Sequence, residues 1–263
     1  MNVELLAHTQ LSRKFVDKLI AGLGFAMPFT SGKAIALTAI RTCYSPGKPS
    51  EIVINEGEKY FGTKATDGKE GSEADRLIRM IIASKHTSTL EGISFVFAVE
   101  DVSRALLAQL TRHRVGFSFS VQSQRYVKFG SNDRSGGFDF VTPDSIGDNE
   151  IPNYQYAVEF DDDYEVTEWK NYTAEEVFEE FMRTAQVTYD RLRKAGVPAE
   201  DARAVLPNAA ATNLVLTVNL RALLDFYSKR KPGAGGQKEI TDLAEELKAA
   251  VIEVEPWTEA FFN

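Results

Sequence analysis

The residues best suited to chemistry lie in one stretch, from Gln109 to Tyr126. It reads QLTRHRVGFSFSVQSQRY and combines three arginines, one histidine and a run of serines and glutamines. Arginine is always charged and binds phosphate or carboxylate through paired hydrogen bonds, while Ser and Gln supply neutral donors and acceptors. This composition is typical of an anion-binding site. The alternative is a solvated helix end followed by an edge strand, because charged clusters often mark only a surface.

A helix is predicted to carry the first half of this stretch. Asp101 is a candidate N-cap for a helix from Val102 to about Arg114. At 3.6 residues per turn, Gln109 and Arg112 would share one face of that helix, whereas Arg112 and Arg114 would point in nearly opposite directions. We therefore expect two anionic partners, or one partner shared between subunits.

Extended segments are predicted at 93–99, 118–129 and 212–219. Alternation in the first of them predicts one buried face, made of Ile93, Phe95, Phe97 and Val99. In the second, Ser123 and Arg125 would project from the same side of the strand.

Further helices are predicted from apolar periodicity and capping signals. They cover 34–42, 72–85, 173 to about 195, 198–206, 220 to about 229, and 237–254. Thr173 and Glu176 form a capping box, and the helix that they open is expected to bury Val177, Phe181, Tyr189 and Leu192. Residues 46–72 are predicted to be an irregular connection.

The whole chain reads as one domain, 1–263, with a surface excursion at 130–172 that is rich in Asp, Glu and Tyr. A net charge of −8 argues against a general nucleic-acid or anionic-membrane binder, because both need a broad basic field. The absence of a long apolar run or a signal pattern at the amino end leads us to expect a cytoplasmic protein.

The sequence lacks the signals of a disulfide, a metal site and a glycine-rich nucleotide-binding loop. Cys43 is the single cysteine, so no internal disulfide is possible, and the three histidines are far apart, so no metal site is expected. Neither a Gly-x-Gly-x-x-Gly fingerprint nor a Gly-Lys-Ser/Thr phosphate loop occurs. Any nucleotide must therefore be held by side chains.

The motif Arg112-His113-Arg114, followed by Ser118 and by Ser123-Gln124-Arg125-Tyr126, resembles the signature of the flavin-dependent thymidylate synthase family. Three residues separate Arg114 from Ser118, where that signature has two. The resemblance extends along most of the chain, through the segments 39–44, 85–91, 203–207, 217–221 and 256–257.

This resemblance implies an α+β fold with a mainly antiparallel sheet flanked by helices, and a homotetramer with active sites between subunits. It implies that FAD, reduced by NADPH, supports the transfer of a methylene from methylenetetrahydrofolate to dUMP, which gives dTMP. Carried over by position, the FAD site would contain His86, Ser88, Glu91, Arg112, His113, Arg114, Asn219, Leu220, Arg221 and Asp225. The dUMP site would contain Gln109, Arg112, Ser123, Gln124, Arg125 and Arg203, and Arg230 would be the catalytic arginine over the pyrimidine.

Two other functions compete with this interpretation. One is a single-stranded nucleic-acid binding module, in which Phe117, Phe119 and Tyr126 would stack on bases beside the arginines. The other is a catalytically inactive flavoprotein. The net charge of −8 weighs against the first, and an assay of dTMP formation separates the second from an active enzyme.

Overall fold

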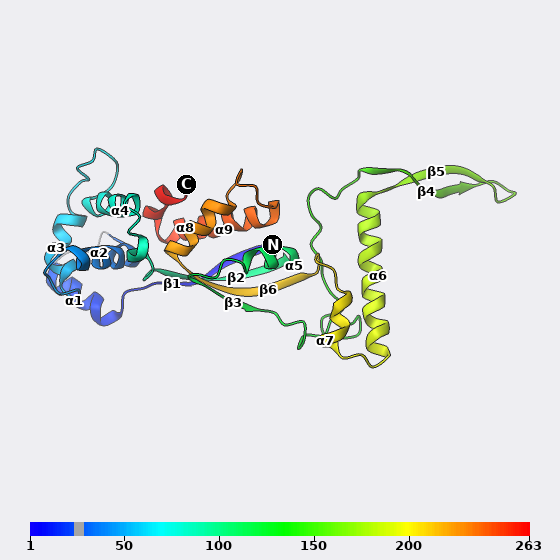
Figure 1. Ribbon diagram of the computed structural model, residues 1–263, viewed down its shortest axis with the longest axis horizontal. Helices are drawn as coiled ribbons and strands as arrows, with labels where there is room; N and C mark the ends of the chain where they lie inside the picture. The colour runs from blue at the N-terminus through cyan, green and yellow to red at the C-terminus, as the bar shows by residue number, and fades with distance from the viewer. Residues whose placement is uncertain (24–28) are drawn as a thin grey trace. The chain divides into compact units, whose positions relative to one another are not determined.

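The computed structural model describes residues 1–23 and 29–263. The chain divides into two compact units (Figure 1). Unit 1 contains residues 1–100, 109–120 and 214–263, and unit 2 contains residues 101–108 and 121–213. Each unit is treated separately below, and the single domain expected from the sequence stays a prediction.

A four-stranded sheet forms the centre of unit 1. Its strand order is β1 (Asn2–His8), β2 (Ser94–Ser103), β6 (Ala211–Asn219) and β3 (Phe117–Val121). β1 and β2 are antiparallel, with Val3 opposite Val99. The predicted strands at 93–99 and 212–219 are confirmed, and the side chains expected on the buried face of the first, Ile93, Phe95, Phe97 and Val99, are fully buried.

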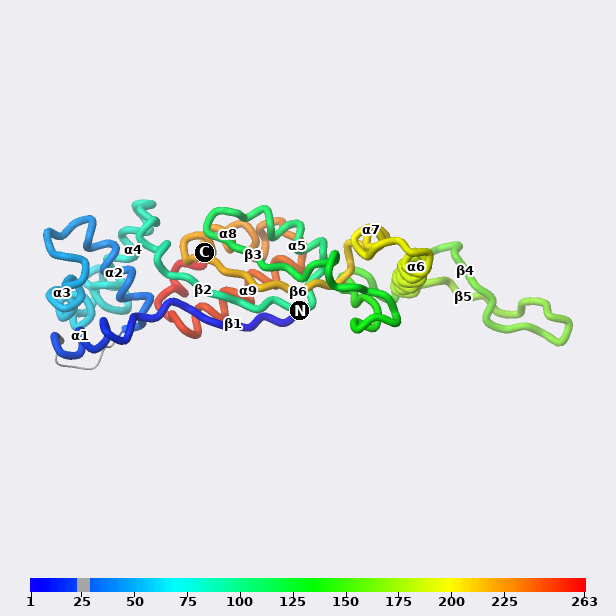
Figure 2. Tube along the Cα trace, turned by 90° about the horizontal axis from the view of Figure 1, so that it is seen from below, coloured from blue at the N-terminus to red at the C-terminus, as the bar shows by residue number. Residues whose placement is uncertain are grey.

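Helices cover this sheet and form a cluster beside it. α8 (Leu220–Arg230) and α9 (Lys238–Val254) lie along one face of the sheet (Figures 1 and 2). α1 (Arg13–Leu23), α2 (Ser31–Tyr44), α3 (Ile52–Phe61) and α4 (Glu73–Ala83) pack on one another. The short helices η1 (Thr87–Leu90) and η3 (Pro256–Phe261) complete the unit. The predicted helices at 34–42, 72–85, 220–229 and 237–254 are confirmed as α2, α4, α8 and α9, each within a few residues of its expected ends.

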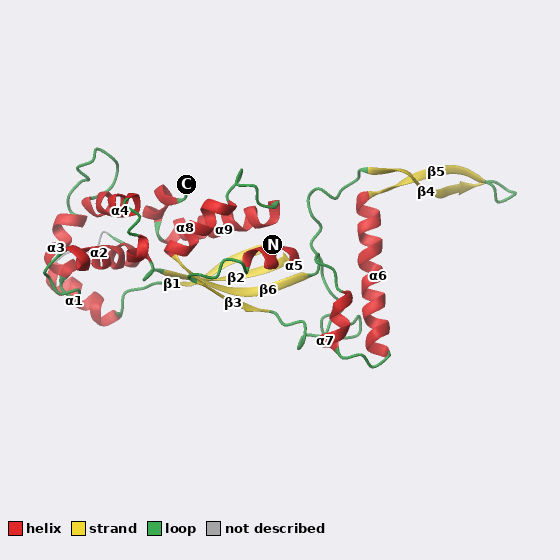
Figure 3. Ribbon diagram, viewed as in Figure 1, coloured by secondary structure: helices red, strands yellow, loops and turns green. Residues whose placement is uncertain are grey.

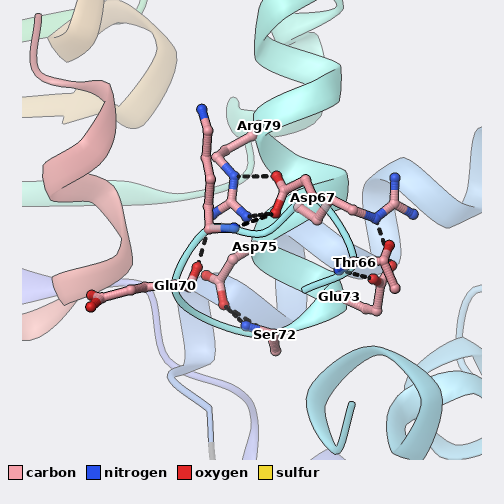
Figure 4. Close-up of polar contacts among 9 residues, drawn as sticks. Thr66, Asp67, Glu70, Ser72, Glu73, Asp75 and Arg79 are labelled. Carbon is pink, nitrogen blue, oxygen red and sulfur yellow. Dashed lines mark hydrogen bonds and ion pairs between the residues drawn. The ribbon is translucent and has the colours of Figure 1, made fainter. Parts of the chain in front are cut away.

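A polar network fixes the start of α4 (Figure 4). The Asp75 carboxylate accepts a hydrogen bond from the Ser72 backbone N–H at 2.8 Å, and Arg79 pairs with Asp67 at 2.9 Å. Hydrogen bonds from Thr66 and Arg76 lower the pKa of Glu73 to about 2. The irregular connection predicted at 46–72 is therefore only partly correct, because α3 lies inside it. Gly, Lys and Glu residues interrupt the apolar periodicity of this helix, so the buried face formed by Ile52, Val53 and Tyr60 is not evident from the sequence.

Unit 2 is built on the long helix α6 (Ala174–Lys194), next to α7 (Ala199–Ala202) and η2 (Arg203–Val205) (Figure 3). The predicted capping box is confirmed, since Thr173 accepts from the Glu176 N–H and the Glu176 side chain accepts from the Thr173 N–H. Tyr189 is fully buried and packs with Phe129 and Ala202. The expected burial of Phe181 is wrong, because this residue is 55% exposed, at the edge of the buried face that Ala185 and Tyr189 form.

The segment 130–172 contains a hairpin that the sequence did not predict. β4 (Glu150–Phe160) pairs with β5 (Val166–Thr173) in antiparallel register, with Tyr156 opposite Lys170. The hairpin leads directly into α6. Its frequent acidic residues and a proline weaken the alternation by which strands are recognised.

The predicted helix from Val102 to Arg114 is wrong at both ends. β2 continues through Ser103, and Asp101 has a φ of 54° and donates its N–H to the Asn213 side chain at 2.8 Å instead of capping a helix. The helix α5 is only Arg104–Leu110. Arg112 and Arg114 lie beyond its end, so the argument from their helical directions does not hold.

The strand predicted at 118–129 is also too long. It corresponds to β3, which ends at Val121. The N–H groups of Tyr126 and Val127 both donate to the Ser123 carbonyl oxygen, and the Arg125 N–H donates to the Ser123 hydroxyl. Ser123 and Arg125 therefore lie in a turn, where local Ser hydrogen bonds compete with a strand.

Candidate active site

A pocket of about 780 Å³ opens in unit 1 beside the amino end of α8. It is formed by the end of α4, η1, the turn before β3, the first turns of α8 and η3. Its lining residues are Ile82, Lys85, Thr87, Glu91, Val115, Gly116, Asn219, Arg221, Ala222, Leu224, Asp225, Ser228 and Phe261. Four of them, Glu91, Asn219, Arg221 and Asp225, belong to the predicted FAD set.

Gly116 allows the backbone to approach α8 closely at this pocket. Its φ is +75°, and a Cβ atom there would lie 2.6 Å from both the Ala222 Cβ and the Asn219 Nδ2. Only glycine adopts this conformation without strain and without a clash. Gly116 is one of the three residues between Arg114 and Ser118, so this part of the motif forms the turn at the pocket wall.

Asn219 caps α8 at the same wall. Its side-chain oxygen accepts a hydrogen bond from the Ala222 N–H at 2.9 Å. The amino end of an eleven-residue helix therefore faces the pocket. Free backbone N–H groups and the helix dipole favour an anion at such a position.

Two ion pairs set the charge of the pocket. The Arg221 guanidinium pairs with the Glu91 carboxylate, and Lys229 pairs with Asp225 at 2.6 Å. The second pair balances the negative charge of Asp225, which would otherwise oppose an anionic ligand. Both pairs are about half exposed, so an incoming ligand can compete for their cations at little cost.

His113 and Arg230 form a further polar pair in unit 1. The Arg230 Nε–H donates to the His113 Nε2 at 3.2 Å, and the imidazole packs edge-on against Phe226, with ring centroids 4.9 Å apart. Burial, followed by the positive charge of Arg230, lowers the pKa of His113. A neutral imidazole is the form that can accept this hydrogen bond.

The other residues predicted for the FAD site lie outside the pocket lining. His86 is half-buried and its Nδ1 lies 3.2 Å from the Tyr44 hydroxyl, whereas Ser88 is exposed in η1. The Leu220 side chain is fully buried, and its N–H donates to the Ile93 carbonyl oxygen. Arg112 and Arg114 are both exposed on the segment that follows α5.

The residues predicted to bind dUMP are divided between the two units. In unit 1, besides Arg112, the Gln109 amide donates to the Gln237 side chain at 2.6 Å. In unit 2, Arg125 and Arg203 meet at Glu200: the Arg125 Nε–H donates to its carboxylate at 2.8 Å, and the Arg203 Nε–H donates to its backbone oxygen at 2.9 Å. The guanidiniums of Arg125 and Arg203, both predicted for the dUMP site, therefore contact the same residue, Glu200.

Two further unit 2 residues bear on this location. Gln124 is buried beside the Ser123 turn. Arg104 was not predicted as a site residue, and burial, followed by the positive charge of Arg203, lowers its pKa.

Sequence reasoning also missed Lys85, Thr87 and Gly116 in the pocket lining. Lys85 follows α4 with a φ of 62°, a conformation that is uncommon outside glycine. A lysine directly after a helix, before a polar segment that precedes a buried strand, is the signal that could have found it. No group of His, Cys, Asp and Glu suited to a metal ion occurs within residues 1–23 and 29–263.

Residues 27–257 match the family described as thymidylate synthase complementing protein. The chain belongs to this family. A flavin-dependent thymidylate synthase of Geobacter sulfurreducens is 38% identical over 223 residues, which cover 85% of this chain and 78% of the relative. One from Nitratidesulfovibrio vulgaris is 35% identical over 205 residues, covering 75% and 69%.

Solved structures confirm the fold expected for the thymidylate synthase complementing protein family. The UMP/dUMP methylase PolB from Streptomyces cacaoi, bound with 5-Br dUMP, gives a TM-score of 0.62 at 24% identity and covers 99% of this chain and 93% of PolB. The flavin-dependent thymidylate synthase ThyX from Helicobacter pylori, complexed with FAD and dUMP, gives 0.57 at 21% identity and covers 100% and 98%. The predicted α+β class is therefore correct. In the part of the chain that the structure describes, no helix has the length and apolar character to cross a bilayer.

Proposed function

We propose that this chain is an FAD-dependent thymidylate synthase that converts dUMP to dTMP. The observation that carries the proposal is the pocket at the amino end of α8, where Arg221 and Lys85 lie beside the capped helix terminus in a member of this family. We further propose methylenetetrahydrofolate as the carbon donor and NADPH as the reductant.

The pocket residues fit FAD in charge and in shape. The helix terminus, Lys85 and Arg221 suit a diphosphate, and the glycine at position 116 lets the turn before β3 lie close to α8 and form the pocket wall. Glu91, Asn219 and Asp225 would complete this side, with His86, Ser88, Leu220, Arg112, His113 and Arg114 as the remaining proposed contacts. When bound, FAD supplies the reducing equivalents that turn a transferred methylene into a methyl group.

The chain's own residues would bind and polarise dUMP. Gln109, Arg112, Ser123, Gln124, Arg125 and Arg203 are the proposed dUMP ligands. In unit 2, Arg125 and Arg203 suit a 5′-phosphate because two guanidiniums meet at Glu200 with only one carboxylate between them.

Arg230 is the proposed catalytic residue. Its guanidinium would lie over the pyrimidine and favour the ionised N3 form, which makes C5 more nucleophilic. His113 acts as a positioning residue, because its neutral Nε2 accepts from the Arg230 Nε–H and leaves the two terminal nitrogens of the guanidinium for the substrate.

We propose that the enzyme works in the cytoplasm as a homotetramer with each active site built between subunits. Support comes from the family membership and from the exposed positions of Arg112 and Arg114, which leave both guanidiniums available to ligands or to another copy.

Two measurements test the chemistry. Purified protein, with FAD added, should show oxidised flavin absorption bands, and addition of dUMP, methylenetetrahydrofolate and NADPH should yield dTMP. Arg112→Ala should weaken the binding of both FAD and dUMP, whereas the matched change Arg13→Ala, at an exposed arginine of α1, should affect neither. Flavin binding without dTMP would indicate an inactive flavoprotein, and absence of both would overturn the proposal.

A further inference from the structure

A second cavity, of about 440 Å³, lies in unit 1 next to the pocket proposed for FAD. Ile82 of α4 and Phe261 of η3 line both cavities, so the two are neighbours. The other lining residues come from α4, from η3 and from the loop at 62–72 that precedes α4. We name this cavity the η3 pocket. Its volume is within the range of roughly 300–1,000 Å³ that small-molecule sites occupy.

The loop at 62–72 is held in place on α4 by one arginine. The Arg79 guanidinium donates to both oxygens of the Asp67 carboxylate, at 3.0 and 2.9 Å (Figure 4). The two side chains are 18% and 28% exposed, so solvent screens this ion pair less than a fully exposed one. The Glu73 N–H donates to the Thr63 oxygen at 2.9 Å, which closes the base of the loop. Compact surface loops with close ends frequently carry function.

Lys69 and Glu70 are the residues of this loop that line the η3 pocket. The Lys69 N–H donates to the Asp67 carboxylate at 3.2 Å. The Glu70 carbonyl oxygen accepts from the Arg79 guanidinium at 3.2 Å, and the Glu70 side chain extends away from the other labelled side chains (Figure 4). The pocket therefore receives one ammonium and one carboxylate group from a loop whose backbone is already ordered.

Most of the remaining lining is apolar. Ile82 and Ala83 of α4 supply aliphatic surface, and Phe261 of η3 supplies an aromatic ring. The Trp257 ring packs edge-on against Phe261, with ring centroids 6.2 Å apart, which helps to fix the position of the Phe261 ring. Aromatic and aliphatic side chains in such an arrangement suit a planar base.

These groups together indicate the chemistry of the ligand. Lys69 is a compact positive charge suited to a phosphate, whereas the charge of Arg79, which also lines the pocket, is already paired with Asp67. Glu70 accepts hydrogen bonds and repels anions, so it favours a ligand that presents an N–H donor as well as a phosphate. An adenosine phosphate has the base, the amino group and the phosphate that these residues require.

We propose that the η3 pocket binds the adenosine 2′-phosphate end of NADPH, with the phosphate at Lys69, the adenine against Phe261 and its amino group at Glu70. The inference rests on the proposed function, in which NADPH is the reductant. It assigns Lys69 as the residue that distinguishes NADPH from NADH, which lacks the 2′-phosphate. Because the two cavities are neighbours, a dinucleotide bound in the η3 pocket can extend toward the FAD pocket.

Direct binding tests the pocket without turnover. With FAD added to fill its own pocket, calorimetric titration with adenosine 2′,5′-bisphosphate should detect binding to the wild type, and Lys69→Ala should weaken it by about tenfold or more. Lys64→Ala is the matched control, because Lys64 is an exposed lysine of the same loop outside the pocket lining, and it should leave the affinity unchanged. No binding by the wild type, or equal affinities for the wild type and Lys69→Ala, would overturn the proposal.

Steady-state kinetics test which nucleotide the pocket recognises. Lys69→Ala should lower kcat/KM for NADPH about tenfold and leave kcat/KM for NADH unchanged, whereas Lys69→Arg, which keeps the charge, should retain most of the preference. Equal losses with both nucleotides would contradict a contact with the 2′-phosphate. A raised KM for methylenetetrahydrofolate with an unchanged KM for NADPH would assign the pocket to the glutamate tail of the folate, and would contradict the proposal equally.

Failure of this inference is separable from failure of the proposed function. With dithionite in place of NADPH, the wild type and Lys69→Ala should form dTMP at equal rates, because Lys69 acts only on the nucleotide. A slower rate for Lys69→Ala under these conditions would contradict its assigned role. Absence of dTMP from both would count against the proposed function, and the titration with adenosine 2′,5′-bisphosphate would still decide the role of the η3 pocket.

Discussion

At the scale of single residues, the site depends on a close approach that only glycine permits. Gly116→Ala should weaken FAD binding by at least about tenfold and cost roughly 1–3 kcal/mol of stability, because the new methyl meets Ala222 and Asn219 and the φ of +75° becomes strained. Gly233→Ala is the matched control: its φ is +81°, but nothing lies within 4 Å of the added carbon. Flavin titration and thermal unfolding of both variants measure the two effects. Equal FAD affinity for the two would show that the approach at Gly116 is unimportant.

A second prediction concerns the protonation of His113. Burial and Arg230 lower its pKa below 6.5, so the folded protein disfavours the protonated ring and the unfolded chain binds more protons. The resulting stability is present above pH 6.5 and is lost as the pH falls from 6.5 through the lower folded value. Between pH 7.5 and 5.5, the wild type should therefore lose several degrees of Tm relative to His113→Phe, which keeps the packing against Phe226.

The control for this experiment is His8→Phe, at a histidine of β1. Its Tm should follow the wild type across the same pH range. If the wild type and His113→Phe show parallel pH profiles, His113 is not the group that titrates. dTMP formation by the wild type should also decline on the acid side, because a protonated imidazole cannot accept from Arg230.

At the scale of elements, the chain end and the start of α2 are joined by one buried carboxylate. Glu255, directly after α9, is fully buried and accepts from the Gly32 N–H at 2.8 Å, from the Thr30 hydroxyl and from the Trp257 indole N–H. Glu255→Gln should cost about 2 kcal/mol, because the amide NH₂ must face at least one of these donors. Chemical denaturation measures the loss, and the exposed Glu253→Gln should be neutral. Equal stabilities for the two variants would contradict this role.

Local signals in the sequence predicted the elements that they control directly. The Thr173 capping box and the alternating residues of 93–99 are short-range patterns, and both correspond to elements of the structure. The start of α5 was mispredicted because Asp101 lies within β2, where its N–H donates to Asn213, a contact distant in sequence that no local pattern indicates. Phe181 was expected to be buried because apolar periodicity does not fix where the buried face is centred, and that face is centred on Ala185 and Tyr189, with Phe181 at its edge.

Part of the candidate site could likewise be predicted from the sequence. Arg221 and Asp225 were found through motif position, and both line the pocket. Lys85 and Gly116 line it because of backbone conformations, with φ values of 62° and +75°, that no composition rule indicates. The pairing of Asp225 with Lys229 likewise required the folded helix, although the spacing of four residues is compatible with it.

At the scale of the whole molecule, two residues of the proposed site lie in different units: Arg221, proposed for FAD, belongs to unit 1, and Arg203, proposed for dUMP, belongs to unit 2. If each active site is built between subunits, a copy that lacks one residue can be complemented by a copy that lacks the other. We expect Arg221→Ala and Arg203→Ala each to reduce dTMP formation by about a hundredfold or more when assayed alone. When the two variants are co-expressed, dTMP formation should recover to about a quarter of the wild-type activity. Random assembly of the two kinds of subunit leaves about one active site in four with both arginines. The control is each variant co-expressed from two copies of its own gene, which should stay as inactive as the variant assayed alone. Mixtures as inactive as the single variants would show that every site is completed within one chain.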